Sequence, residues 1–180
     1  HGGGFVGGSG NLDMRSVSHW LSQDVVVVSF NYRLGVLGIF AHPALDMSEG
    51  ANFSVLDMVA ALKWVNSHIS AFGGDPDNVT IAGGSAGGMA VQMLMVAPQS
   101  ESLFHRAISQ SGYGAWPLPR TNNLKPLPQS LNAQEYAQVL ASRVISKAAS
   151  SVTAEDLNNV SASQWVEAVE GFHLPVADGI

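Results

Sequence analysis

Two glycine-rich segments hold the residues of this chain that could do chemistry. Residues 1–5 read His-Gly-Gly-Gly-Phe, and residues 83–87 read Gly-Gly-Ser-Ala-Gly. Glycines two positions before and after a serine, here Gly83 and Gly87, fit a sharp, strained strand-to-helix turn that exposes the serine hydroxyl. A run of glycines lets backbone N–H groups approach a developing negative charge. The two segments together predict nucleophilic attack by Ser85, with backbone amides stabilising an oxyanion.

The sequence on either side of Ser85 predicts the elements that such a turn requires. Residues 78–82 are a short β-branched run after a turn signal at 73–77, and they predict a buried strand. Residues 86–96 are good helix formers, and Pro98 ends that run. A glycine-rich turn with an idle serine is the alternative, and the order of strand, turn and helix favours the nucleophile.

The remaining periodicity predicts an α/β protein. Residues 25–31 are continuously apolar and β-branched, which is typical of a strand buried on both faces of a parallel sheet. Residues 104–112 predict another buried strand, and residues 13–23 predict a short helix. A longer helix is predicted over 54–70, with one apolar face made of Val55, Val59, Leu62, Val65 and Ile69. We therefore expect a mostly parallel, doubly wound sheet with helices on both faces, and a site at the carboxyl ends of its strands.

The character of the sequence changes after Gly112. A proline-rich loop comes first, followed by predicted helices from 133 to about 149 and from 153 to about 170. We assign residues 1–112 to the core that carries both glycine segments. Residues 113–180 are assigned to a loop and helical insertion near the substrate entrance, within the same domain. A pair of solvent-facing helices is an equal alternative for this insertion.

Composition limits the class of protein. Only 12% of the 180 residues are charged and 19 are glycine, which leads us to expect an internal fragment of a longer chain. The net charge of −6 argues against a nucleic-acid partner. No apolar run reaches the roughly 18 residues of a membrane span. With no cysteine there is no disulfide framework. A secreted and a cytoplasmic location both stay open, as does the oligomeric state.

Seven segments together resemble one known family, the type-B carboxylesterases, which include cholinesterases and bacterial carboxylesterases. The resemblance is dense over residues 1–112 and returns weakly at 174–179. It implies an α/β-hydrolase fold, hydrolysis of small-molecule carboxylic esters and no cofactor. The segments that carry it are residues 1–5, 27–38 (VVSFNYRLGVLG), 62–65, 72–76, 78–81, 83–88 and 103–112 (LFHRAISQSG).

The resemblance also implies roles for individual residues. Ser85 would be the nucleophile that forms an acyl-enzyme. The backbone N–H groups of Gly3, Gly4 and Ala86 would form the oxyanion hole. Phe5 and Trp116 are candidates for lining the acyl or alcohol pocket, and a core or lid role for Trp116 is an equal alternative.

Two positions depart from the family pattern. The family usually has Glu before the nucleophile, where this chain has Gly84, and it reads G-N-x-G-L-x-D-Q where residues 51–58 read ANFSVLDM. The missing Glu removes a side chain that could brace the turn. Because catalysis depends on positions held within fractions of an ångström, we expect weaker activity than in a typical member.

The partners of the nucleophile are expected outside this chain. In this fold the order is Ser, acid, His, and no histidine here fits that order. His105 lies in a strand-like segment, and His173 precedes the segment that comes before the acid in the family. His19, His42 and His68 precede the serine, and no Asp or Glu cluster beside them has metal-ligand spacing, so we expect no metal.

Two other functions are alternatives to an ester hydrolase. Some members of this superfamily are non-catalytic adhesion or binding proteins, and such a relative is the main alternative. The retained Ser85 and the intact glycine loop favour the enzyme. A hydrolase of amides, thioesters or long-chain lipids is also open, because the depth of the pocket depends on elements outside this segment.

Overall fold

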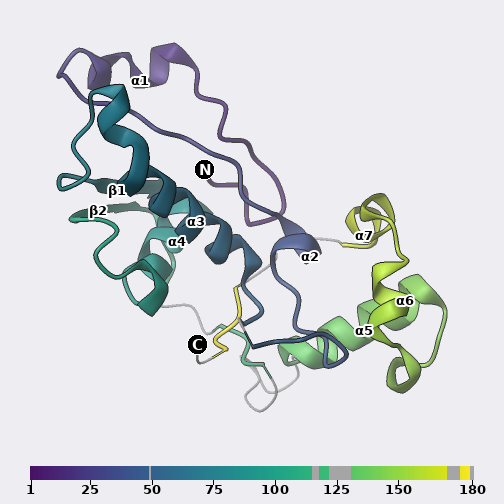
Figure 1. Ribbon diagram of the computed structural model, residues 1–180. Helices are drawn as coiled ribbons and strands as arrows, with labels where there is room; N and C mark the ends of the chain where they lie inside the picture. The colour runs from purple at the N-terminus through teal and green to yellow at the C-terminus, as the bar shows by residue number, and fades with distance from the viewer. Residues whose placement is uncertain (49, 115–117, 122–130, 170–174, 179–180) are drawn as a thin grey trace. The chain divides into compact units, whose positions relative to one another are not determined.

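The computed structural model describes residues 1–48, 50–114, 118–121, 131–169 and 175–178, and the chain packs as two units (Figure 1). The first unit comprises His1–Tyr32 and Val55–Gly114, and the second comprises Arg33–Ser54 and Ala115–Ile180. The boundary that we placed at residue 112 stays a prediction. Trp116 and His173 lie outside the described residues.

A strand–helix–strand unit forms the centre of the first unit. Strands β1 (Thr80–Gly84) and β2 (Arg106–Gln110) pair in parallel, with Gly83 opposite Ser109. Helix α4 (Ala86–Leu94) follows β1 directly and packs against both strands. A short 3₁₀ turn, η2 (Pro98–Ser100), comes after it. The predicted α/β class, with its parallel strands, is confirmed.

Two further helices of the chain match their predicted positions. Helix α1 (Met14–Leu21) is capped at its N-terminus by Asp13, whose side chain accepts a hydrogen bond from the Arg15 N–H. Helix α3 spans Phe53–His68 and continues into the 3₁₀ turn η1 (Ile69–Phe72). Gly73 ends that turn in the left-handed region, at φ 82°. All five residues predicted for the apolar face of this helix are buried: Val55, Val59, Leu62, Val65 and Ile69.

The prediction of a strand over residues 25–31 is wrong. These residues form no strand, and Val25, Val26 and Val28 are each more than 40% exposed. Instead of a backbone ladder, the segment makes side-chain contacts with Gly10: the Gly10 N–H donates to Asn31 Oδ1 at 2.8 Å, and the Ser29 hydroxyl donates to the Gly10 carbonyl. A strand needs a neighbouring backbone with which it exchanges hydrogen bonds, and no backbone–backbone hydrogen bond joins residues 25–31 to the other described residues.

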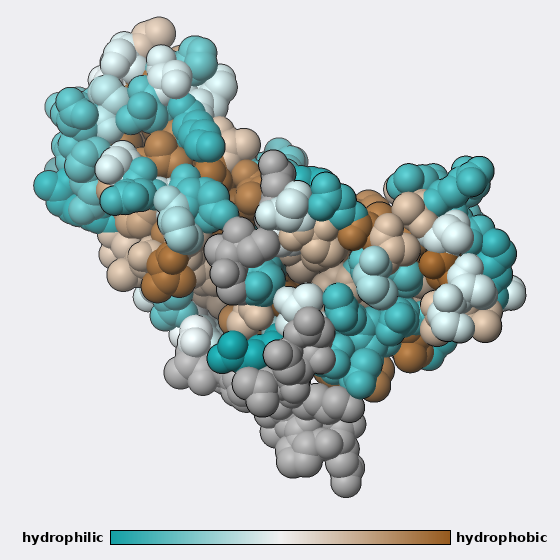
Figure 2. Space-filling model, turned by 60° about the horizontal axis from the view of Figure 1, so that its bottom comes forward, coloured by the Kyte–Doolittle hydropathy of each residue, from teal (hydrophilic) through white to brown (hydrophobic). Residues whose placement is uncertain are grey.

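The predicted burial of the second strand is also wrong. The strand itself forms, as β2, but all five of its residues are exposed. Apolar surface remains open on other described residues too, and Figure 2 shows brown apolar areas among teal ones on one face. A sheet of two strands covers little of its own side-chain surface, so burial on both faces would need further layers. No helix in the described part of the chain has the length and apolarity to cross a bilayer.

The second unit is helical and has a core of its own. Helix α2 (Gly35–Gly38) packs against α7 (Ala162–Ala168), and α5 (Ala133–Ile145) packs against α7 and α6 (Ala154–Asn158). The rings of Phe40 and Trp165 lie 5.3 Å apart at its centre. Its buried cluster consists of Val36, Phe40, Ala137, Leu140, Ala141, Val152, Leu157 and Trp165.

The helix predicted from 153 to about 170 is two helices. Thr153 begins α6 and Ser161 begins α7, and each side chain accepts a hydrogen bond from the backbone three residues later. Each of these residues is part of a capping box, in which the third helical residue bonds back to the cap. A capping box marks the start of a helix, so the box at Ser161 divides the predicted helix in two.

Asn52 fastens the segment 175–178 to the second unit. Its amide nitrogen donates to the Val176 carbonyl at 2.8 Å, and its oxygen accepts from the Val176 N–H at 2.8 Å. Asp178 accepts from the Asn52 side chain at 2.7 Å and from the Ala51 N–H at 2.9 Å. Asn52 is buried, so these bonds are shielded from water.

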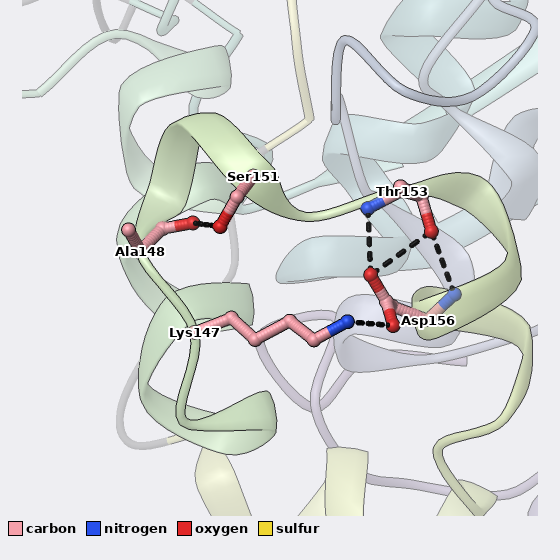
Figure 3. Close-up of polar contacts among 5 residues, drawn as sticks. All are labelled: Lys147, Ala148, Ser151, Thr153 and Asp156. Atoms are coloured by element: carbon pink, nitrogen blue, oxygen red, sulfur yellow. Dashed lines mark hydrogen bonds and ion pairs between the residues drawn. The ribbon is translucent and has the colours of Figure 1, made fainter.

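An ion pair joins the start of α6 to the turn before it (Figure 3). Lys147 Nζ lies 2.5 Å from Asp156 Oδ1. The other carboxylate oxygen accepts from the Thr153 N–H at 3.0 Å and from the Thr153 hydroxyl at 2.9 Å. Between Lys147 and α6 lies the 3₁₀ turn η3 (Ala149–Ser151), where the Ser151 hydroxyl donates to the Ala148 carbonyl. These bonds, the one from Lys147 first, lower the pKa of Asp156 to about 2.

We expect the substitution Lys147→Met to raise the pKa of Asp156 from about 2 toward its ordinary value of 3.8. The folded-state pKa is the lower one, so the stability that this carboxylate contributes is present above pH 3.8 and is lost as the pH falls toward 2. NMR titration of the Asp156 carboxyl carbon measures the change. Lys63→Met, on α3, is the matched control and should leave that titration where it is. An unchanged titration midpoint of Asp156 in Lys147→Met would show that the ion pair does not lower the pKa of this carboxyl group.

Candidate active site

Ser85 occupies a strained turn between β1 and α4. Its backbone lies at φ 57° and ψ −123°, a region that residues other than glycine rarely adopt. The Ser85 carbonyl accepts the first bond of α4, from the Met89 N–H at 3.0 Å, and the Ser85 N–H donates to Gln110, at the end of β2, at 2.8 Å. The predicted order of strand, turn and helix is confirmed, and the serine is exposed.

The glycines around Ser85 have no room for a side chain. A Cβ on Gly83 would lie 2.3 Å from the Gly87 carbonyl oxygen, and a Cβ on Gly87 would lie 3.0 Å from the His1 carbonyl oxygen. Gly84 differs from both, because a Cβ there would meet no atom within 4 Å. The position at which the family has Glu is thus sterically open in this chain.

The first glycine segment lies beside the serine. A Cβ on Gly2 would come within 3.3 Å of the Ser85 Cβ and 2.8 Å of the Gly84 carbonyl oxygen. Gly3 and Gly4 both have positive φ, at 115° and 62°, and the loop turns back so that the Gly7 N–H donates to the Gly3 carbonyl at 3.0 Å. The two glycine segments, which begin 82 positions apart in the sequence, are therefore packed backbone to backbone.

The backbone N–H groups of Gly3, Gly4 and Ala86 belong to these two loops. Ala86 is the first residue of α4, where an amide has no partner within its own helix. Across the described residues, no hydrogen bond engages the N–H of Gly3, Gly4 or Ala86. Unpaired amides of this kind can bind an anion, and the start of a helix adds a favourable dipole.

Tyr32 is a residue of this region that sequence reasoning missed as a site residue. Its ring stacks on His1 with centroids 4.3 Å apart and planes 13° apart, and its hydroxyl donates to the His1 carbonyl at 2.5 Å. Burial, with a smaller effect from Tyr113, raises the pKa of Tyr32 to about 12. The only signal in the sequence was its place inside segment 27–38, which carries the family resemblance.

Phe5, a candidate pocket residue, is completely buried in the described structure. It has φ 60°, and its ring centroid lies 6.2 Å from that of Tyr32. Its role in lining a pocket stays a prediction. The role of Trp116 stays a prediction as well, because that residue lies outside the described part of the chain.

His105, His68 and His42 each have local partners of their own. His105 Nδ1 accepts from the Val79 N–H at 3.1 Å, and the His105 N–H donates to the Val79 carbonyl at 2.8 Å, so the residue extends the pairing of the strands. His68 stacks on Trp64, and His42 is buried against Phe40, where burial lowers its pKa. His19 lies in the last turn of α1. Over the described residues, no three or more His, Cys, Asp or Glu side chains gather as metal ligands.

Comparison with known proteins gives one consistent result. A sequence model described as the Carboxylesterase family matches residues 1–178. The chain is 49% identical over 122 residues to fumonisin B1 esterase of Sphingopyxis macrogoltabida, which covers 66% of this chain and 23% of that protein. It is 40% identical over 182 residues to liver carboxylesterase 1F of Rattus norvegicus, covering 97% of this chain and 32% of that protein.

Solved structures agree with the sequence comparison. A PNB esterase superposes with a TM-score of 0.78 at 34% identity, covering 99% of this chain and 38% of that one. The chain thus spans between about a quarter and two fifths of the length of the relatives it matches.

We expect Gly83→Ala to destabilise the protein, because its new Cβ would overlap the Gly87 backbone. Overpacking of this kind costs about 1–3 kcal/mol. Gly84→Ala is the matched control: it adds the same atom one residue later, into open space, and should change stability little. The midpoints of denaturant unfolding measure both variants. Equal midpoints for the two would contradict the close contact between Gly83 and Gly87.

Proposed function

The chain belongs to the carboxylesterase family, and from that premise we propose that it carries the nucleophile and the oxyanion hole of a serine carboxylic-ester hydrolase. The observation that carries the proposal is the backbone of Ser85, held at φ 57° and ψ −123° at the end of β1. Positive φ at a serine between strand and helix is the geometry that exposes a nucleophilic hydroxyl. The resemblance noted in the sequence is confirmed, and the α/β-hydrolase fold is the fold of its structural neighbours.

In the proposed mechanism Ser85 forms an acyl-enzyme. The Ser85 Oγ attacks the ester carbonyl carbon while its proton passes to a general base, which gives a tetrahedral intermediate. The C–O bond to the alcohol then breaks, and the alcohol leaves with that proton. Water then attacks the acyl-enzyme, and one of its protons passes to the base. The bond to Ser85 Oγ breaks, the base gives that proton to Ser85 Oγ, and the carboxylic acid is released.

The amides of Gly3, Gly4 and Ala86 are proposed to bind the oxyanion. Within the described part of the chain, they are donors without a hydrogen bond in two loops that meet at Gly2 and Ser85. Each preorganised donor of this kind contributes about 3–4 kcal/mol to the transition state, and glycine at two of the positions lets the backbone reach the oxygen without a side chain in the way. Ala86 is buried, which keeps water from competing at its amide.

The general base and its acid are assigned to residues other than the described histidines. His105 is engaged with the backbone of Val79, and His68 Nδ1 donates to the Trp64 carbonyl at 2.9 Å. His42 Nδ1 accepts from the Ala44 N–H at 3.1 Å. Without a base, a serine hydroxyl is an ordinary alcohol, so this assignment predicts that activity needs residues beyond these.

The substrate class follows from the family and from the names of the relatives. One relative is named for fumonisin B1 and another, from Bacillus subtilis, for a para-nitrobenzyl ester. Both names denote esterases. For this chain we propose small-molecule carboxylic esters as a class, with p-nitrophenyl esters as practical probes.

Labelling with a fluorophosphonate tests the proposal directly. The Ser85 oxygen should displace fluoride and form a stable bond to phosphorus, with one label per protein. Ser85→Ala should abolish both the label and turnover of p-nitrophenyl acetate. Ser146→Ala is the matched control, since Ser146 is also exposed and has φ 59° but lies at the end of α5. Absence of label in the parent protein would favour a non-catalytic binding relative.

We expect Gly84→Glu to raise kcat by roughly 10-fold, because it restores a brace beside a nucleophile whose position must hold within a fraction of an ångström. The site is open to the new side chain. Gly84→Ala separates the two causes of any gain: it removes the flexibility of glycine but adds no carboxylate. Initial rates on p-nitrophenyl acetate give the comparison, and an unchanged or lower kcat in Gly84→Glu would contradict the expectation.

A further inference from the structure

The oxyanion loop, residues 1–5, depends on contacts from outside itself. Three consecutive glycines have the largest backbone entropy of any tripeptide, so the loop has little intrinsic preference for the shape it adopts. Gly3, Gly4 and Phe5 all have positive φ, and at Phe5 this conformation is strained for a residue with a side chain. Some other part of the structure must therefore hold the ends of this loop.

Tyr32 contacts both ends of the oxyanion loop. At the first end its hydroxyl donates to the His1 carbonyl at 2.5 Å and its ring stacks on the imidazole at 4.3 Å. At the other end its ring lies at a tilt of 58° to that of Phe5, with centroids 6.2 Å apart. Tyr32 is 6% exposed and Phe5 is fully buried, so these contacts are shielded from water.

The His1 carbonyl also faces the helix that begins after the serine. Its oxygen is the nearest atom to a Cβ built on Gly87, at 3.0 Å. The hydrogen bond from Tyr32 therefore fixes the His1 carbonyl, which packs against α4 at Gly87, two residues after Ser85. A shift of this carbonyl would move Gly3 and Gly4 relative to the serine.

We propose that Tyr32 is a positioning residue of the oxyanion hole, whose hydroxyl and ring together set where the Gly3 and Gly4 amides lie relative to Ser85. The proposal rests on the proposed function, since it assigns Tyr32 to that same site. Tyr32 acts through His1 and Phe5 and does not touch the substrate. The role requires a phenol that donates, and because burial and Tyr113 raise the pKa of Tyr32 to about 12, it stays protonated at neutral pH.

Tyr32→Phe is the variant that tests this, because it removes the hydroxyl and keeps the ring. We expect kcat to fall between about 10-fold and about 100-fold, as a displaced oxyanion donor would cause, while KM for p-nitrophenyl acetate stays within about threefold. Affinity for a trifluoromethyl ketone, which forms an oxyanion on the serine, should fall by a factor similar to the loss in kcat. Tyr136→Phe, on α5, is the matched control and should leave all three quantities unchanged.

Hydrogen exchange of the Gly2–Phe5 amides separates this inference from the proposed function. If Tyr32 holds the loop, exchange there should be at least about 10-fold faster in Tyr32→Phe than in the parent protein or Tyr136→Phe. Suppose that the unsubstituted protein takes no fluorophosphonate label and does not hydrolyse p-nitrophenyl acetate, while amide exchange is faster in Tyr32→Phe. That result would overturn the proposed esterase activity and the catalytic effect of Tyr32, and it would support only the contact between Tyr32 and the loop. An active parent protein with unchanged kcat and ketone affinity in Tyr32→Phe would overturn the inference alone. If Tyr32→Phe lowers both kcat and the midpoint of thermal unfolding but leaves the affinity for the ketone unchanged, the role of Tyr32 is only structural and the inference is overturned.

Discussion

The close approach of two backbone segments at Ser85 is the contact on which the rest of the first unit depends. A left-handed backbone at a serine is unfavourable, and it persists only where its surroundings over-determine it. Here Gly83 touches Gly87 across the turn, Gln110 at the end of β2 accepts the Ser85 N–H, and the first glycine loop lies against the serine from the other side. Each of these neighbours is a backbone group, which explains why glycine is required so often in so short a stretch.

The same packing continues along α4. A Cβ on Gly88 would lie 2.7 Å from the Gln110 carbonyl oxygen, so the helix can approach the end of β2 only because this residue has no side chain. The Ser109 hydroxyl donates to the Gly88 carbonyl at 2.9 Å and adds a polar link at the same place. The strand, the turn and the helix are therefore joined by close backbone contacts, and Tyr32 contacts the glycine loop at His1 and Phe5. A nucleophile and its anion-binding amides need this kind of fixed framework, because their effect depends on geometry that is set before the substrate arrives.

The second unit is stabilised by different means. Trp165 and Phe40 make an aromatic contact inside an aliphatic cluster, and capping boxes at Thr153 and Ser161 define where its short helices begin. Residues 33–54 belong to this unit although they precede Ser85 in the sequence. Asn52 is central to this arrangement, since it bonds the backbone of Val176 from more than 120 residues away. The segment that departs from the family pattern thus still makes a specific long-range contact.

Local sequence patterns were enough to predict the strand, turn and helix around Ser85, the buried face of α3 and the family of the chain. The structural features among these follow from short-range constraints, namely side-chain periodicity and the spacing of the glycines around the serine. Only the tertiary structure decided that residues 25–31 form no strand, that β2 is exposed and that Tyr32 joins both ends of the glycine loop. A strand requires a partner backbone, burial requires a covering layer, and the role of Tyr32 requires His1 and Phe5 to be brought to it. None of these conditions is a property of the segment concerned, so no local pattern could have fixed them.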